Sequence, residues 1–167
     1  MNNVFVLMNM QEYLRANAFQ GQLDAVLERQ REIIEYCRTA TIPIINVTTD
    51  FEGLDNRVLG EIDKKLVDVK DIARFTKKDW NAFNFGKFAR EIRTRKYDNL
   101  FISGAYAGRD VLSTVSTRDI GGVKMISSKD LLINNGVDNF EVIEDGLRTA
   151  LHGYHSNYRE FMAGLAS

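Results

Sequence analysis

The sequence predicts an α/β protein of three layers, α/β/α, with a mostly parallel sheet of about five strands. Short apolar segments alternate along the chain with segments in which apolar residues recur every three or four positions. This alternation is typical of strands and helices that build a parallel sheet covered on both faces. The apolar segments are also unbroken, as expected for strands buried on both sides. With 167 residues and no repeat or linker, the chain is expected to form one domain over residues 1–167.

The expected strands are short runs rich in Val, Ile, Leu and Phe. Runs of this length are too short for most helices, and β-branched residues favour the extended conformation. The first run, VFVLM at residues 4–8, contains no polar residue. In chain order the expected strands span residues 4–8, 43–47, 72–75, 100–103 and 123–127.

Three helices are expected between these strands, over residues 22–38, 85–95 and 110–120. The first two carry their apolar residues along one stripe, and a pair of glycines follows the third as a stop signal. The polar, glycine-containing stretch 48–71 is expected to connect two strands. The stripe of the first helix consists of Leu23, Val26, Leu27, Gln30, Ile33, Ile34 and Cys37.

The last segment is expected to form one long helix over residues 137–165, with no sixth strand. Its apolar residues recur at alternating steps of three and four, which gives a heptad-like seam that either packs on the sheet or meets a second subunit. An open sheet edge is a liability, so we expect the last helix or a subunit contact to shield it, and a homo-oligomer. The seam consists of Phe140, Ile143, Leu147, Leu151, Tyr154, Tyr158, Phe161 and Leu165.

Charge and composition argue against several classes of partner. The chain has 22 basic and 23 acidic residues, a net charge of −1, so neither a nucleic acid nor an anionic membrane is expected to bind. The run at residues 4–8 is too short to span a membrane and follows no basic residue, so we expect no signal peptide. The single cysteine, Cys37, permits no intramolecular disulfide, and a cytoplasmic protein is the simplest interpretation.

Candidate binding residues directly follow the expected strands. In folds of this class, ligands bind at the carboxyl ends of the strands, near the point where the strand order reverses. The residues to consider are therefore Asn9, 48–50, 76–78, 104–110 and 128–130.

Three of these strand ends carry motifs that occur together in one known family. MNMQEYL (residues 8–14) follows the first strand, FTKKDWNAF (75–83) the third and ISGAYAGRDVLSTVSTRD (102–119) the fourth. In this order the motifs resemble the isochorismatase-like, or cysteine hydrolase, superfamily over roughly residues 3–132. The matching positions are Met10, Gln11, Lys77, Ala82, Phe83, Gly104, Tyr106 and Ala107.

The resemblance implies a site built on an Asp, a Lys and a nucleophilic Cys, but two of these residues differ here. Lys77 is kept, whereas Asn9 stands at the position of the Asp and Asp110 at that of the Cys. Members that act on isochorismate also lack the Cys and use the Asp as an acid. A thiolate mechanism needs a thiol. Since Cys37 lies on the apolar stripe of the first helix, we do not expect thiol-dependent amidase chemistry.

Asp110 is the carboxylate left in this constellation. If Lys77 lies near it, the ammonium and the start of a helix both favour the ionised form, so we expect a base or an ion-pair partner rather than an acid. Asn9 then avoids a second carboxylate beside the first, and it is expected to accept a hydrogen bond from Lys77. Alternatively, Asp110 is a helix N-cap, either alone or combined with a Lys77 salt bridge, and Asn9 satisfies backbone groups of its loop.

The surrounding residues indicate a pocket for a small polar or carboxylated molecule, without a metal or other cofactor. Arg109 would add positive charge, although it could equally face solvent. His152 and His155 are three residues apart, but no acidic or cysteine ligand is clearly arranged with them. The candidates for substrate binding are Gln11, Trp80, Phe83, Tyr106 and Arg109.

Two functions fit these observations. The first is a divergent hydrolase of the isochorismatase-like family that works through Asn9, Lys77 and Asp110. The second is a catalytically inactive member that serves as a binding, regulatory or assembly protein. Turnover of an amide, ester or vinyl ether that Asp110→Ala abolishes would favour the first, and ligand binding without turnover would favour the second.

Overall fold

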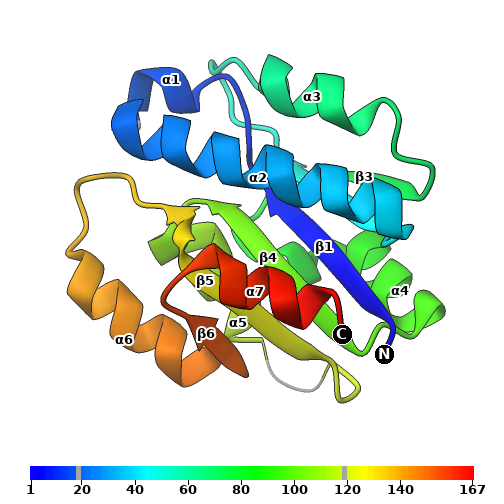
Figure 1. Ribbon diagram of the computed structural model, residues 1–167. Helices are drawn as coiled ribbons and strands as arrows, with labels where there is room; N and C mark the ends of the chain where they lie inside the picture. Colours follow the sequence, from blue (N-terminus) through cyan, green and yellow to red (C-terminus); the bar gives the residue numbers. More distant parts are fainter. Residues whose placement is uncertain (18–19, 118–119) are drawn as a thin grey trace.

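The computed structural model describes residues 1–17, 20–117 and 120–167. Within these residues, six parallel strands form one sheet in the order β3-β2-β1-β4-β5-β6, with helices on both faces (Figure 1). The expected α/β/α class and the five expected strands are confirmed, and a sixth strand is added to them. The strands are β1 (Asn3–Met8), β2 (Ile44–Thr49), β3 (Ile72–Lys77), β4 (Asn99–Ala105), β5 (Lys124–Ile133) and β6 (Gly153–His155).

Each face of the sheet has its own helices and its own apolar core. The predicted stripe of α2 is buried on the first face, where every one of its residues is at most 4% exposed. Burial of one such aliphatic side chain stabilises the fold by roughly 1.5–3 kcal/mol. The first face carries α1 (Leu14–Asn17), α2 (Gln20–Ala40), α3 (Gly60–Leu66) and α7 (Tyr158–Leu165), and the second carries η1 (Ala82–Asn84), α4 (Gly86–Arg95), the π-helical turn η2 (Ala107–Val111), α5 (Leu112–Val115) and α6 (Phe140–Ala150).

Two helical segments differ from the sequence-based expectation in the middle of the chain. The helix predicted over 110–120 begins earlier, at Ala107, and α5 ends at Val115; residues 118–119 lie outside the described residues. The polar stretch 48–71, expected as a connection, contains the short helix α3. Its two buried residues are too few to produce a clear apolar period in the sequence.

The prediction of a single long helix over residues 137–165 is wrong. At Leu151 the backbone turns to an extended conformation, with φ −81° and ψ 144°, which ends α6. Strand β6 then pairs with β5. Asn157 starts α7, because its side chain accepts hydrogen bonds from the N–H groups of Arg159 and Glu160, as an N-cap does.

The heptad-like seam is therefore divided between the two faces of the sheet. Ile143 and Leu147 of α6 pack in the core of the second face, whereas Phe161 and Leu165 of α7 pack in that of the first. Because β6 lies beside β5 at the edge of the sheet, the missing sixth strand no longer argues for a subunit contact. The homo-oligomer stays a prediction. No helix among the described residues is long and apolar enough to cross a membrane.

The strand order reverses between β1 and β4 at the centre of the sheet. The chain adds β2 and β3 on one side of β1, and then β4, β5 and β6 on the other. The last residue of β1, Met8, pairs with Gly104 of β4. A Cβ on Gly104, where φ is 134°, would lie 2.0 Å from the Met8 carbonyl oxygen. Only glycine permits this approach, which brings the loops that follow the two strands together.

Candidate active site

Lys77, the last residue of β3, is the centre of the predicted constellation and is only 1% exposed. Its ammonium group donates three hydrogen bonds. The acceptors are the Oδ1 atom of Asp110 at 2.5 Å, the hydroxyl of Thr49 at 2.7 Å and the carbonyl oxygen of Asp79 at 2.8 Å. Because an ammonium has three protons, these bonds use its full capacity. The structure thus brings Lys77 and Asp110 together, as the resemblance to the family implies.

Asn9 is linked to Lys77 through Thr49 rather than directly, which corrects the expected bond. The Oδ1 atom of Asn9 accepts a hydrogen bond of 2.8 Å from the hydroxyl of Thr49. The backbone of Asn9 has a φ of 53°, in the left-handed region that asparagine tolerates better than most residues. Its N–H donates to the carbonyl oxygen of Val47 at 2.7 Å. Asn9 therefore fits both the turn after β1 and the hydrogen-bond chain to the ammonium.

Asp110 lies inside the turn η2 and is not its N-cap, which is Tyr106. Its Oδ2 atom is 3.4 Å from the backbone nitrogen of Tyr106, which donates to it, and its side chain is 1% exposed. The peptide between Ala105 and Tyr106 is cis. The N-cap alternative is wrong, because the N-cap position is Tyr106, whereas the Lys77 salt bridge that could accompany it is present.

Burial is the largest influence on the pKa values of Lys77 and Tyr106. It lowers the pKa of Lys77, while the charge of Asp110 and the hydrogen bond to it act in the opposite direction. Burial also raises the pKa of Tyr106, and the charge of Asp110 adds to that rise. Both ions of such a buried pair lose their hydration. The contribution of the pair to the stability of the fold therefore depends on the hydrogen bonds that surround it.

Gln11 holds the ends of two loops in place beside the ion pair. Its Nε2 atom donates to the carbonyl oxygens of Thr49 and Asn56, each at 2.9 Å, and its Oε1 atom accepts from the N–H of Thr49 at 2.8 Å. The side chain is fully buried. These bonds fix Thr49, so Gln11 acts on the site through Thr49.

Tyr13 was not among the predicted site residues, although it belongs to the first motif. Its ring packs at a right angle on Phe51, with centroids 5.3 Å apart, and against Tyr106 at 6.3 Å. Burial strongly raises the pKa of Tyr13, and the charge of Asp110 raises it further. Neither the Tyr13 hydroxyl nor the Nδ2 atom of Asn9 has a hydrogen-bond partner among the described residues. Two buried polar groups thus remain unpaired around the ion pair.

The other predicted binding residues take different positions. The guanidinium of Arg109 lies 5.3 Å from the centre of the Trp80 ring, and both side chains are exposed. Arg109 lies within η2 beside Asp110, and Trp80 follows β3 beside Asp79. This cation–π contact therefore joins the two segments. Phe83 packs on Phe88 in the core of the second face, whereas Tyr106 packs against the core of the first. The structure does not bring these two aromatic rings together.

The two histidines do not form a shared site. The Nδ1 atom of His152 accepts a hydrogen bond of 3.2 Å from the N–H of Met125, while His155 lies 3.4 Å from a carboxylate oxygen of Glu160. Across the described ranges, no group of three His, Cys, Asp or Glu side chains is placed to hold a metal ion.

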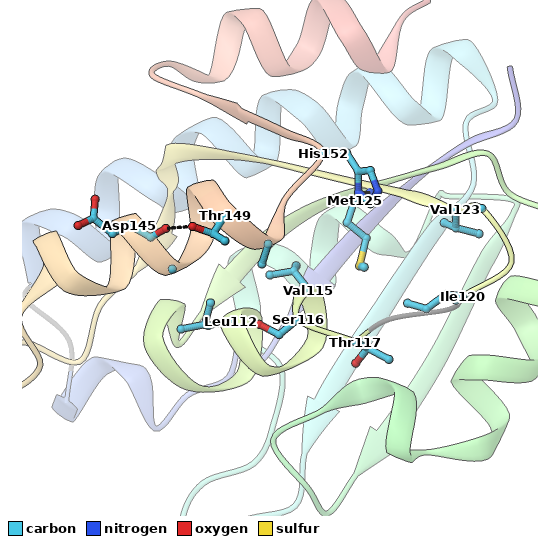
Figure 2. Close-up of a pocket in the computed structure, with 13 residues that line it drawn as sticks. Leu112, Val115, Ser116, Thr117, Ile120, Val123, Met125, Asp145, Thr149 and His152 are labelled. Carbon is cyan, nitrogen blue, oxygen red and sulfur yellow. Dashed lines mark hydrogen bonds between the residues drawn. The ribbon is translucent and has the colours of Figure 1, made fainter.

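A cavity of about 920 Å³ lies elsewhere, between α5, α6 and the amino end of β5 (Figure 2). Its walls include Leu112 and Val115 from α5, Met125 from β5 and His152 after α6. None of the predicted site residues lines it. The ion pair lies at the opposite, carboxyl edge of the sheet, which is the edge where ligands bind in parallel α/β folds.

Comparison with known proteins identifies the fold. No protein-family model matches the sequence, and a search of curated proteins finds no match. The structure is similar to that of a ribonuclease from Caenorhabditis elegans (TM-score 0.79, 17% identity, 98% of this chain and 81% of that one). It is also similar to N-carbamoylsarcosine amidase from Thermoplasma acidophilum (0.76, 16%, 93% and 96%) and to an isochorismatase family protein from Burkholderia thailandensis (0.75, 15%, 99% and 96%). The chain therefore has the isochorismatase-like fold that its motifs resemble.

Proposed function

We propose that the protein is a divergent hydrolase of the isochorismatase-like fold, which acts on a small polar or carboxylated molecule with Asp110 as its base. The observation that carries this proposal is the buried pair of Lys77 and Asp110 at the carboxyl edge of the sheet. A carboxylate that is kept from bulk water and oriented by a cation is suited to take a proton from an attacking water molecule. An amidase and an isochorismatase family protein among the neighbours of similar fold support a hydrolytic reaction.

The hydrogen bonds give each residue a role in this reaction. Lys77 holds Oδ1 of Asp110 at 2.5 Å, while the contact of Oδ2 within the described part of the chain is the long one of 3.4 Å with the Tyr106 N–H. A carboxylate oxygen has two lone pairs, so Oδ2 retains the capacity to accept a proton from water. Thr49 and Asn9 hold the ammonium side of the pair. Asp110 then returns the proton to the leaving group when the scissile bond breaks.

A second candidate is a non-catalytic protein that binds a small ligand in the same place. It is favoured by one observation: both oxygens of Asp110 already accept hydrogen bonds from the protein. A carboxylate held in this way could have a purely structural role, in which it holds the loops around the site together.

A screen of small amides, esters and vinyl ethers separates the two candidates. The hydrolase requires that the wild-type protein turns over at least one of them and that Asp110→Ala abolishes this turnover. Ligand binding, measured by thermal shift, without turnover of any compound would support the non-catalytic protein instead.

A further inference from the structure

The loop between β5 and α6 contains the only Asn-Gly pair of the sequence, Asn135 and Gly136. The backbone of Gly136 has a φ of 75°, a conformation that glycine adopts without strain. Gly136 is exposed, and its N–H group has no hydrogen-bond partner among the described residues. This backbone nitrogen directly follows Asn135, and no Cβ shields it.

Three hydrogen bonds hold the carboxamide of Asn135. Its Oδ1 atom accepts from the N–H groups of Val137 at 3.0 Å and Asp138 at 3.1 Å, and its Nδ2 atom donates to the Asp138 carboxylate at 2.8 Å. Two N–H donors stabilise the negative charge that develops on a carbonyl oxygen when a nucleophile attacks its carbon. Because the Gly136 nitrogen belongs to the adjoining peptide, its attack closes a five-membered ring at little entropic cost.

We infer that Asn135 is a modification site, at which the folded protein deamidates spontaneously. The Gly136 nitrogen gives up its proton and bonds to Cγ of Asn135, the Cγ–Nδ2 bond breaks, and ammonia leaves with that proton. Water then adds to one of the two carbonyl carbons of the cyclic imide and opens the ring. The product is aspartate, or isoaspartate in which the chain continues through Cγ. The sum of the steps consumes one water and releases one ammonia, so the reaction is independent of the proposed hydrolase activity.

The product would loosen the contact between this loop and the turn η2. A carboxylate at residue 135 has no proton to donate to Asp138, and the two negative charges repel each other. Asp138 lies against η2, since a Cβ on Gly108 would be 3.7 Å from its Oδ2 atom. Gly108 precedes Asp110 by two residues in the same turn. The modification would therefore change the packing of the turn that carries the buried carboxylate.

Asn157 provides a matched control within the same chain. Its Oδ1 atom accepts from the N–H groups of the second and third residues after it, both at 3.1 Å, and its Nδ2 atom donates to the Glu160 carboxylate at 2.8 Å. Asn135 makes the same three bonds at the same spacing, and both asparagines are partly buried. They differ in the residue that follows, which is Gly136 in one case and Tyr158, the first residue of α7, in the other.

Peptide mapping of the folded protein after incubation at mildly alkaline pH tests the inference. Cleavage after Lys and Arg places the two asparagines in separate peptides, 130–148 and 149–159. Deamidation adds about 1 Da, because OH replaces NH₂, and fragment ions assign the gain to one residue. Asn135 should react at least about tenfold faster than Asn157, since a side chain on the following residue hinders the ring closure that Gly136 permits. Gly136→Ala should slow the reaction of Asn135 to a similar extent.

The inference is overturned if Asn135 gains no mass, if the two asparagines react equally fast, or if Asn135 reacts only after unfolding in urea. The effect of the product is measured on Asn135→Asp. This variant should lower Tm by about 2–4 °C, as the loss of one hydrogen bond implies, and amide hydrogen exchange should be faster in residues 107–111. Asn135→Ser keeps an oxygen that accepts from the two N–H groups and adds no charge, so it should have a smaller effect. Unchanged exchange in residues 107–111 of Asn135→Asp would overturn the proposed effect on η2.

Discussion

Lys77 and Asp110 form a buried ion pair, Nζ to Oδ1 at 2.5 Å. Lys77 ends β3 and Asp110 lies in η2, which follows β4, so β2 and β1 separate the two strands concerned. The hydroxyl of Thr49, at the end of β2, accepts a hydrogen bond from the same ammonium and donates one to Asn9, which follows β1. The pair therefore ties together the ends of four adjacent strands. Since neither charge is in contact with water, each depends on the other for compensation.

Removal of one member of the pair should destabilise the protein more than removal of both. Lys77→Met or Asp110→Leu leaves one buried charge without its partner and should lower the free energy of unfolding by about 3–5 kcal/mol. The double variant replaces the pair by apolar groups and should lose much less. Urea unfolding of the three variants measures the coupling. Losses that simply add in the double variant would show that the two charges do not compensate each other.

A methyl group at Gly104 should disrupt the central strands. Its Cβ would lie 2.0 Å from the Met8 carbonyl oxygen at a φ of 134°, so Gly104→Ala should cost about 3 kcal/mol or more. The matched control is Gly60→Ala at the start of α3, where a Cβ meets nothing within 4 Å. This change should leave stability unchanged or raise it by up to about 1 kcal/mol. Thermal unfolding of both variants checks the contrast, and equal effects would contradict it.

Cys37 should make the protein less stable in alkali. Burial raises the pKa of its thiol from 9.0 to about 12, so the folded state keeps a proton that the unfolded chain has lost. The contribution of the thiol is full below pH 9.0 and is lost as the pH rises toward 12. In this window the free energy of unfolding should fall by about 1.4 kcal/mol per pH unit more steeply in the wild type than in Cys37→Ala. Identical slopes in urea titrations would refute this prediction.

The break between α6 and α7 should depend on Asn157. Its side chain accepts from the N–H groups of Arg159 and Glu160, so Asn157→Ala should cost about 1 kcal/mol. Ser156→Ala, at the exposed neighbouring position, should change stability by less than about 0.5 kcal/mol. Chemical unfolding of the two variants tests the cap; a continuous helix through this segment would make them equivalent.

The centre of the fold could be predicted from the sequence because its strands are apolar throughout. The C-terminal segment could not be predicted in this way, because the three- and four-residue spacing of its apolar residues does not show which face of the sheet each residue covers. By their spacing in the sequence Ile143 and Phe161 belong to one seam, but they pack on opposite faces of the sheet. The signals that could have revealed the break were Gly153, which weakens a helix, and Asn157, a favoured N-cap.

The site was predictable only where its residues fell within the recognised motifs. The resemblance to the family implied that Lys77 lies close to Asp110, and the structure shows that contact. Thr49 and Tyr13 were not assigned roles, because a hydroxyl at a strand end and an aromatic residue in a loop are common in any sequence. Their importance follows from the direction of the hydrogen bonds and from burial, which only the folded structure shows.

The kcat of Asp110→Asn tests the central claim most directly. The substitution keeps the shape of the side chain and removes the base, so kcat on a substrate of the wild-type protein should fall about 10²–10⁴-fold, while circular dichroism shows a folded protein. If this variant does not fold, the double variant Lys77→Met/Asp110→Leu takes its place. A kcat equal to that of the wild type would contradict the account.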